Sequence, residues 1–121
     1  MNNTPPPMPK APASVIVTSG NDVAGYKITG YLGIVRGLVV RTPGIGKAFM
    51  GALKSIGGGN ITEYVQVCET ARGHAYDTMV AHAAALGADG IIAMRYDATE
   101  FMQGATEVLC YGTAVRLEPL P

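Results

Sequence analysis

The segment from Asn60 to Asp89 constrains the fold most strongly, because it predicts one long, capped helix followed directly by a strand. Asn60 can accept a backbone hydrogen bond at the start of this helix, and Glu63 completes an asparagine version of the capping box. Gly87 predicts the end of the helix, since glycine readily adopts the left-handed conformation that closes a last turn. A helix of this length measures about 39 Å and crosses the whole of a domain of this size. The apolar segment Ile91–Met94 that follows is typical of a buried strand.

The long helix is predicted to have two weakly polar surfaces. At 100° per residue, one stripe is expected to face the core, and it consists of Ile61, Tyr64, Val65, Cys68, Ala71, Ala75, Met79, His82, Ala83 and Leu86. A flank beside this stripe is less polar than a solvated face should be. We interpret that flank as a second contact surface, made of Val67, His74, Thr78, Ala81 and Ala85.

Four apolar segments are predicted to be strands, at 15–18, 31–41, 90–101 and 106–117. An irregular stretch is expected between the first and the second. The second strand is rich in Leu, Ile and Val, so we expect it to be buried on both faces. Gly33 and Gly37 within it predict a bulge or a close approach by another backbone.

The last two strands are predicted to form a hairpin. On the second of them, one face carries only small side chains, from Val108, Cys110, Gly112 and Ala114, which lets the alanine-rich helix lie close to the sheet. A short helix is predicted at 45–56. The fold class is therefore α+β, a small antiparallel or mixed sheet with one long helix and one short helix.

The composition predicts one domain, at 14–121, which associates with itself. Residues 1–13 contain five prolines and are expected to form a flexible tail. The chain is 48% hydrophobic, only 15% charged and has no formal net charge, so it lacks the basic surface that nucleic-acid binding requires. Low net charge and few charged side chains favour association of copies.

A reducing, aqueous compartment is expected from the cysteines and the apolar pattern. Cys68 and Cys110 are too few for a disulfide framework in 121 residues. No apolar run approaches the roughly 20 residues that a membrane-spanning helix needs, and the start of the chain lacks the apolar core of a signal peptide. We therefore predict a soluble cytoplasmic protein without a membrane partner.

The order of several motifs resembles the YbjQ-like family, uncharacterised proteins that often carry a heavy-metal-binding label. The motifs are Tyr31-Leu32-Gly33-Ile34-Val35-Arg36-Gly37, Ala52-Leu53-Lys54-Ser55-Ile56-Gly57-Gly58, Thr62-Glu63-Tyr64, Ala71-Arg72, Leu86-Gly87-Ala88-Asp89-Gly90-Ile91-Ile92 and Glu107-Val108-Leu109-Cys110-Tyr111-Gly112-Thr113-Ala114-Val115. The resemblance covers nearly all of 15–116. It implies an α+β subunit that assembles as a ring, a homopentamer, and it implies no established activity.

Cys68, His82 and Cys110 are the candidate metal ligands. Cys68 and His82 are 14 positions apart, about 21 Å along the helix, so they cannot hold one metal within a subunit. Cys110 could approach Cys68 across the helix–sheet contact, or His82 across a subunit interface, to form a site for zinc or copper. We favour the alternative in which the cysteines are small buried hydrophobes and His82 is a hydrogen-bonded core residue, with no cofactor.

The remaining patterns do not predict an enzyme. The segment Thr42–Ala48 resembles a phosphate loop, but Ala48 stands where a magnesium-binding hydroxyl is required. Arg36 and Arg95 are expected to form a structural network with nearby carboxylates, with an anion pocket as the alternative. Without a Ser-His-Asp set, we predict a homo-oligomeric binding or scaffolding domain, and the resemblance implies that the oligomer is a pentamer. A zinc- or copper-binding protein with ligands at a subunit interface is the alternative.

Overall fold

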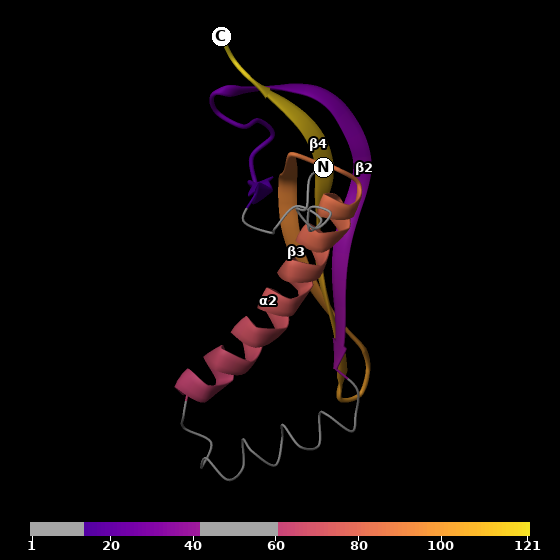
Figure 1. The fold of residues 1–121 in the computed structure, drawn as a ribbon. Coiled ribbons are helices and arrows are strands. Elements are labelled where there is room, and N and C mark those ends of the chain that lie inside the picture. Colours follow the sequence, from indigo (N-terminus) through magenta and orange to yellow (C-terminus); the bar gives the residue numbers. More distant parts are fainter. Residues whose placement is uncertain (1–13, 42–60) are drawn as a thin grey trace, which may run out of the picture.

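A four-stranded sheet crossed by one long helix forms the part of the chain that the structure, a computed structural model, describes, which is 14–41 and 61–121 (Figure 1). The elements are β1 (Ile16–Val17), β2 (Tyr26–Arg41), α2 (Ile61–Ala85), β3 (Gly90–Met102) and β4 (Ala105–Pro119). The strand order is β1-β3-β4-β2, with β1 parallel to β3 and the other neighbours antiparallel. The α+β class with a mixed sheet is confirmed. The predicted tail at 1–13 and short helix at 45–56 lie outside the described residues.

The long helix and the hairpin are confirmed. Helix α2 ends as predicted, because Gly87 has a φ of 77° and the N–H of Ala88 donates to the carbonyl of Ala83 at 3.0 Å. The hairpin turns at Gln103-Gly104, where Gly104 has a φ of 79°. It places β4 in the centre of the sheet and leaves the long β2 at one edge.

The helix lies close to the sheet because most of the residues between them are small. Ala71, Ala75 and Ala83 are buried, as predicted, together with the larger Met79. On β2, a Cβ on Gly37 would collide with the carbonyl oxygen of Ala75 and come within 2.6 Å of the Met79 nitrogen. The close backbone approach predicted for this glycine is therefore confirmed.

The predicted core stripe of α2 is wrong at both ends. Val65, Cys68, His82 and Leu86 are exposed, whereas Val80 and Ala84 are buried. The helix crosses the sheet obliquely, and its N-terminal half runs away from the strands (Figure 1). Different sides of α2 therefore face the sheet along its length, so a single straight stripe of residues does not describe the contact. The side chains of Ile61 and Tyr64 lie outside the described part.

The description of β2 as a strand buried on both faces is also wrong. Only one face of the sheet is covered by α2, and Val35 and Gly37 point toward it. Tyr31 and Ile34 are each 70% exposed. The strand also begins earlier than predicted, at Tyr26, because two register shifts interrupt its alternating pattern. One of these shifts is the bulge predicted at Gly33, where φ is 104°.

Candidate functional site

An apolar groove opens where α2 leaves the sheet. Its volume is about 230 Å³, and its lining residues are Val67, Cys68, Ala71 and Arg72 of α2, Ala98 of β3, and Thr106 and Val108 of β4. The four helical residues lie three and four positions apart, so they share one face of α2. Arg72 is the charged residue among them. The groove is thus an apolar surface with a single cation at its wall.

A bulge in β3 turns the floor of this groove toward the helix. The β3–β4 register shifts between Ile92 and Arg95, and Ala93 has a φ of 55° there. Because side chains alternate along a strand, one inserted residue exchanges the two faces. Beyond the bulge, Tyr96 and Ala98 therefore share the helix-facing side with their register partners on β4.

Tyr96 connects the groove with the buried core. The guanidinium carbon of Arg72 lies 5.3 Å from the centroid of the Tyr96 ring, within cation–π range. The Tyr96 hydroxyl donates a hydrogen bond to the sulfur of Cys110, its register partner. Burial, followed by the neighbouring Cys110, raises the pKa of Tyr96. Arg72 of α2 therefore contacts Tyr96 of β3 beside the groove.

Cys110 is a buried thiol in contact with a second sulfur. The side chain is fully buried, and its Sγ donates to the Sδ of Met79 at 3.6 Å. Burial raises the pKa of Cys110, and the hydrogen bond from Tyr96 only partly opposes this effect. The thiol is therefore protonated at neutral pH and a poor nucleophile.

We expect the free energy of unfolding to decrease as the pH rises above 9.0, the ordinary pKa of a thiol. A group whose pKa is raised in the folded state contributes fully below its unfolded pKa, and this contribution is lost as the pH rises through the folded pKa. Urea unfolding at pH 8 and pH 10 measures the change. In Cys110→Ala with Tyr96→Phe the change should be smaller, whereas Cys68→Ser should behave as the wild type. If the free energy of unfolding of the double variant changes between pH 8 and pH 10 as much as that of the wild type, Cys110 and Tyr96 are not the cause.

His82 was predicted to lie in the core, but it lies at the edge of the sheet. Its Nδ1 accepts a hydrogen bond of 3.3 Å from the backbone N–H of Arg36 on β2. The prediction of a hydrogen-bonded histidine is confirmed, and its predicted burial is wrong. The bond satisfies one donor on the edge strand.

The candidate metal ligands are not brought together within one subunit. Cys68 lies in the groove, Cys110 is buried against Met79, and His82 is at the edge of β2. Both thiols are free. Among 14–41 and 61–121, no group of three His, Cys, Asp or Glu residues could hold a metal ion. The residues of one described subunit therefore do not fit a zinc or copper centre.

For Arg95, the predicted carboxylate partners are replaced by backbone carbonyl groups. Arg95 donates to the carbonyl oxygens of Ser19 and Met94, each at 2.8 Å. Arg116 makes an ion pair of 3.4 Å with Asp89 instead. The phosphate-loop-like segment Thr42–Ala48 lies outside the described residues.

The family model described as "Putative heavy-metal-binding", YbjQ-like, matches residues 15–118. The chain belongs to this family. A UPF0145 protein of Chromobacterium violaceum is 55% identical over 87% of this chain and 90% of its own. UPF0145 proteins of Legionella pneumophila (strain Lens) and Solibacter usitatus are 58% and 48% identical, over 84% and 85% of this chain and 97% and 92% of theirs.

A crystal structure of a DUF74-family protein of unknown function from Pediococcus pentosaceus is also similar. It shares 18% identity, with a TM-score of 0.40, over 86% of this chain and 98% of that chain. Within the described part of this YbjQ-like chain, no helix combines the length and apolarity that crossing a bilayer requires.

Proposed function

We propose that this YbjQ-like protein is a self-assembling binding or scaffolding domain of the cytoplasm, whose copies form a ring, without a catalytic role. The resemblance implies five copies. The observation that carries the proposal is the outer face, the side of the sheet opposite α2. It exposes large apolar side chains from β2 and β4, namely Tyr31, Ile34, Leu38, Val40 and Tyr111.

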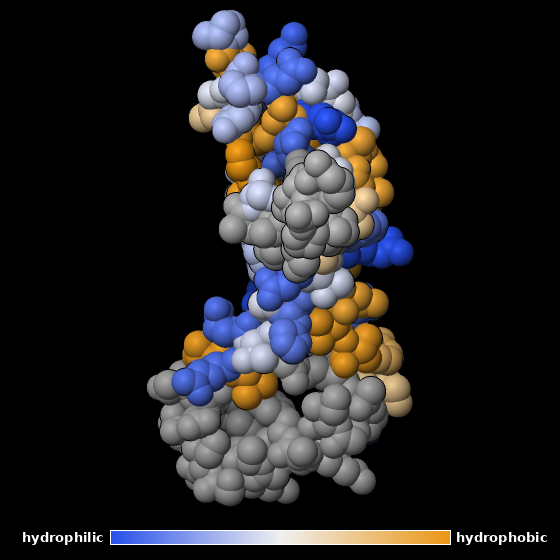
Figure 2. Space-filling view, viewed as in Figure 1, coloured by the Kyte–Doolittle hydropathy of each residue, from blue (hydrophilic) through white to orange (hydrophobic). Residues whose placement is uncertain are grey.

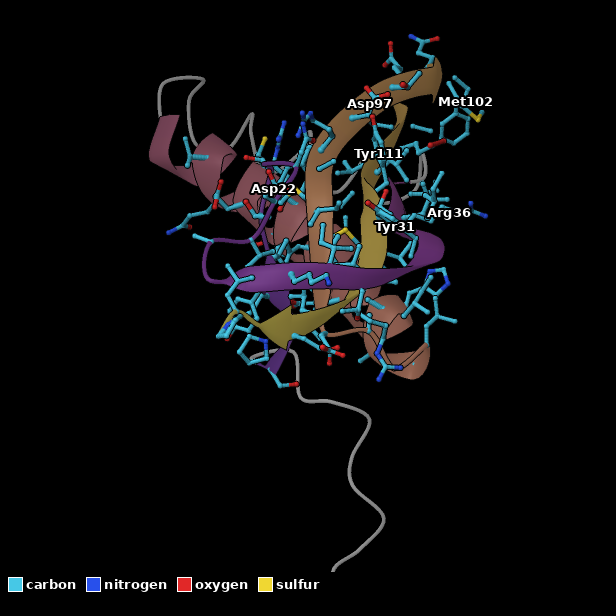
Figure 3. All side chains as sticks on the ribbon, turned by 90° about the horizontal axis from the view of Figure 1, so that it is seen from above. Asp22, Tyr31, Arg36, Asp97, Met102 and Tyr111 are labelled. Carbon is cyan, nitrogen blue, oxygen red and sulfur yellow. The ribbon has the colours of Figure 1, made fainter. Side chains whose placement is uncertain are left out.

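The outer face is continuous across the two strands. Leu38 pairs with Leu109, and Arg36 with Tyr111, so these side chains form adjacent rows. Figure 3 shows Tyr31 and Tyr111 on the same side of the sheet, and Figure 2 shows hydrophobic residues along the edge of the molecule over β2. Contiguous exposed apolar surface of this kind marks an interaction site.

The edge position of β2 supports contact between copies. An edge strand offers backbone donors and acceptors that another chain can pair. Among the described residues, His82 binds one of these donors, on Arg36. A neighbouring copy that pairs with β2 would remove this edge from water. The free thiols fit a reducing compartment.

Native mass spectrometry of untagged protein, purified without chelator, tests the proposal. We expect a mass near five times the 12.6 kDa subunit. Ile34→Asp should weaken association at least about tenfold, because an interface would bury an unpaired charge, while an isolated subunit leaves this position exposed. Gln66→Glu, on the exposed polar side of α2, adds the same charge and should assemble normally. Unchanged assembly of Ile34→Asp would contradict the proposal for this face.

The helix flank makes a separate prediction within the same experiment. Ala81 is exposed on α2, so Ala81→Glu should break the ring only if the flank is also an interface. A wild-type mass for Ala81→Glu together with dissociation of Ile34→Asp assigns the contact to the sheet alone.

The second candidate function is zinc or copper binding with ligands from two subunits. Cys68 and His82 are both exposed on α2, so a neighbouring copy can reach them. The same native spectrum then shows a stoichiometric metal mass that Cys68→Ser removes. A metal-free assembly would contradict this candidate.

A further inference from the structure

We propose that the groove beneath the N-terminal half of α2 binds a small apolar carboxylate, with the chain in the groove and the carboxylate on Arg72. All of its lining residues come from one subunit. The site therefore does not depend on the proposed assembly, and it can be tested in the Ile34→Asp variant as well as in the wild type.

The walls of the groove select an apolar chain. Val67, Ala71, Ala98 and Val108 are aliphatic and line it from three elements. The volume of about 230 Å³ corresponds to about eight water molecules at ~30 Å³ each. This is smaller than pockets for drug-sized ligands, so the groove suits a chain of about eight non-hydrogen atoms.

Arg72 selects the charge of the ligand. Its side chain is exposed, and among the described residues no carboxylate forms an ion pair with it. The guanidinium carbon lies over the Tyr96 ring, 5.3 Å from its centroid, and the guanidinium carries five N–H donors. A carboxylate can accept two parallel hydrogen bonds from such a guanidinium.

Thr106 and Cys68 add polar atoms on opposite walls. Thr106 provides a hydroxyl donor from β4, and Cys68 provides an exposed thiol one helical turn before Arg72. Neither residue is a carboxylate. The groove therefore combines aliphatic walls, neutral polar atoms and one cation, which complements an apolar acid and disfavours an amine.

Calorimetric titration with octanoate, octan-1-ol and octylamine tests the site. We expect octanoate to bind in the millimolar range or tighter, at least about tenfold more strongly than octan-1-ol, with no binding of octylamine. Arg72→Gln should remove the preference for the acid, because the amide keeps polarity but loses the charge. Equal affinity of the acid and the alcohol in the wild type would overturn the assignment to Arg72.

Two further variants locate the ligand. Ala98→Leu should block octanoate, because it fills the groove from an exposed position on β3 that tolerates a larger side chain. Ala85→Leu makes the same change at the exposed far end of α2 and should bind normally. Bound octanoate should also slow alkylation of Cys68 by N-ethylmaleimide. Undiminished binding to Ala98→Leu, or no octanoate binding to the wild type, would overturn the proposal.

Discussion

Replacing Gly37 with alanine is expected to lower the free energy of unfolding by at least about 3 kcal/mol, or to prevent folding. The new Cβ would collide with the carbonyl oxygen of Ala75 and lie 2.6 Å from the nitrogen of Met79. Both obstacles are helix backbone, so no side-chain rotation relieves them. Helix α2 would have to move away from β2 along much of their contact. Urea unfolding followed by circular dichroism measures the loss.

Gly73→Ala provides the matched control. It makes the same chemical change in α2, where a Cβ has nothing within 4 Å. Because alanine favours helix over glycine by up to about 1 kcal/mol, this variant should be slightly more stable than the wild type. If both variants unfold at the same urea concentration, α2 does not rest on β2 at Gly37.

The sequence was sufficient for the elements whose signals are local. The C-terminal end of α2 follows from Gly87, and the hairpin follows from a glycine turn between two apolar segments. The close approach at Gly37 was also predicted, since a glycine within a strand often has this cause. These predictions succeed because each depends on a few neighbouring residues.

The groove could not be predicted, because it results from two long-range features. The oblique crossing of α2 exposes Cys68, although the helical period places it on the core stripe. The bulge at Ala93 brings Tyr96 and Ala98 to the helix side, although simple alternation from Ile91 would place Arg95 and Asp97 there. The contact of Arg72 with the Tyr96 ring depends on the same two features, because it joins α2 to β3 beyond the bulge.

The outer face was missed for a different reason. The many Leu, Ile and Val residues of β2 were interpreted as burial on both faces, which is what a complete layer of helices would produce. In the described part of the chain, α2 covers one face of the sheet, and Val23 of the segment before β2 covers the other face only where it packs on Ile92, Val115 and Leu117. Away from that contact, the apolar residues of β2 include exposed side chains such as Ile34 and Leu38.

Replacing Met79 with alanine is expected to cost about 2–5 kcal/mol, because this side chain is fully buried between α2 and the sheet. The substitution leaves a cavity beside Cys110, because the sulfur of Cys110 contacts Met79 in the wild type. Cys110 should consequently react with N-ethylmaleimide faster than in the wild type. Met102→Ala removes a 52% exposed side chain and should change stability by no more than about 0.5 kcal/mol.

Met79→Leu separates packing from the contact between the two sulfurs. It keeps the apolar volume, so it should cost less than about 1.5 kcal/mol and leave Cys110 protected, provided that packing is what shields the thiol. Rapid alkylation of Cys110 in a stable Met79→Leu variant would show instead that the sulfur contact holds the thiol in place. In that case the position of Cys110, and through it the positions of Tyr96 and Arg72, depends on Met79. Met79→Leu should then also weaken octanoate binding in the groove. With packing alone, octanoate affinity remains that of the wild type, because Met79 does not line the groove.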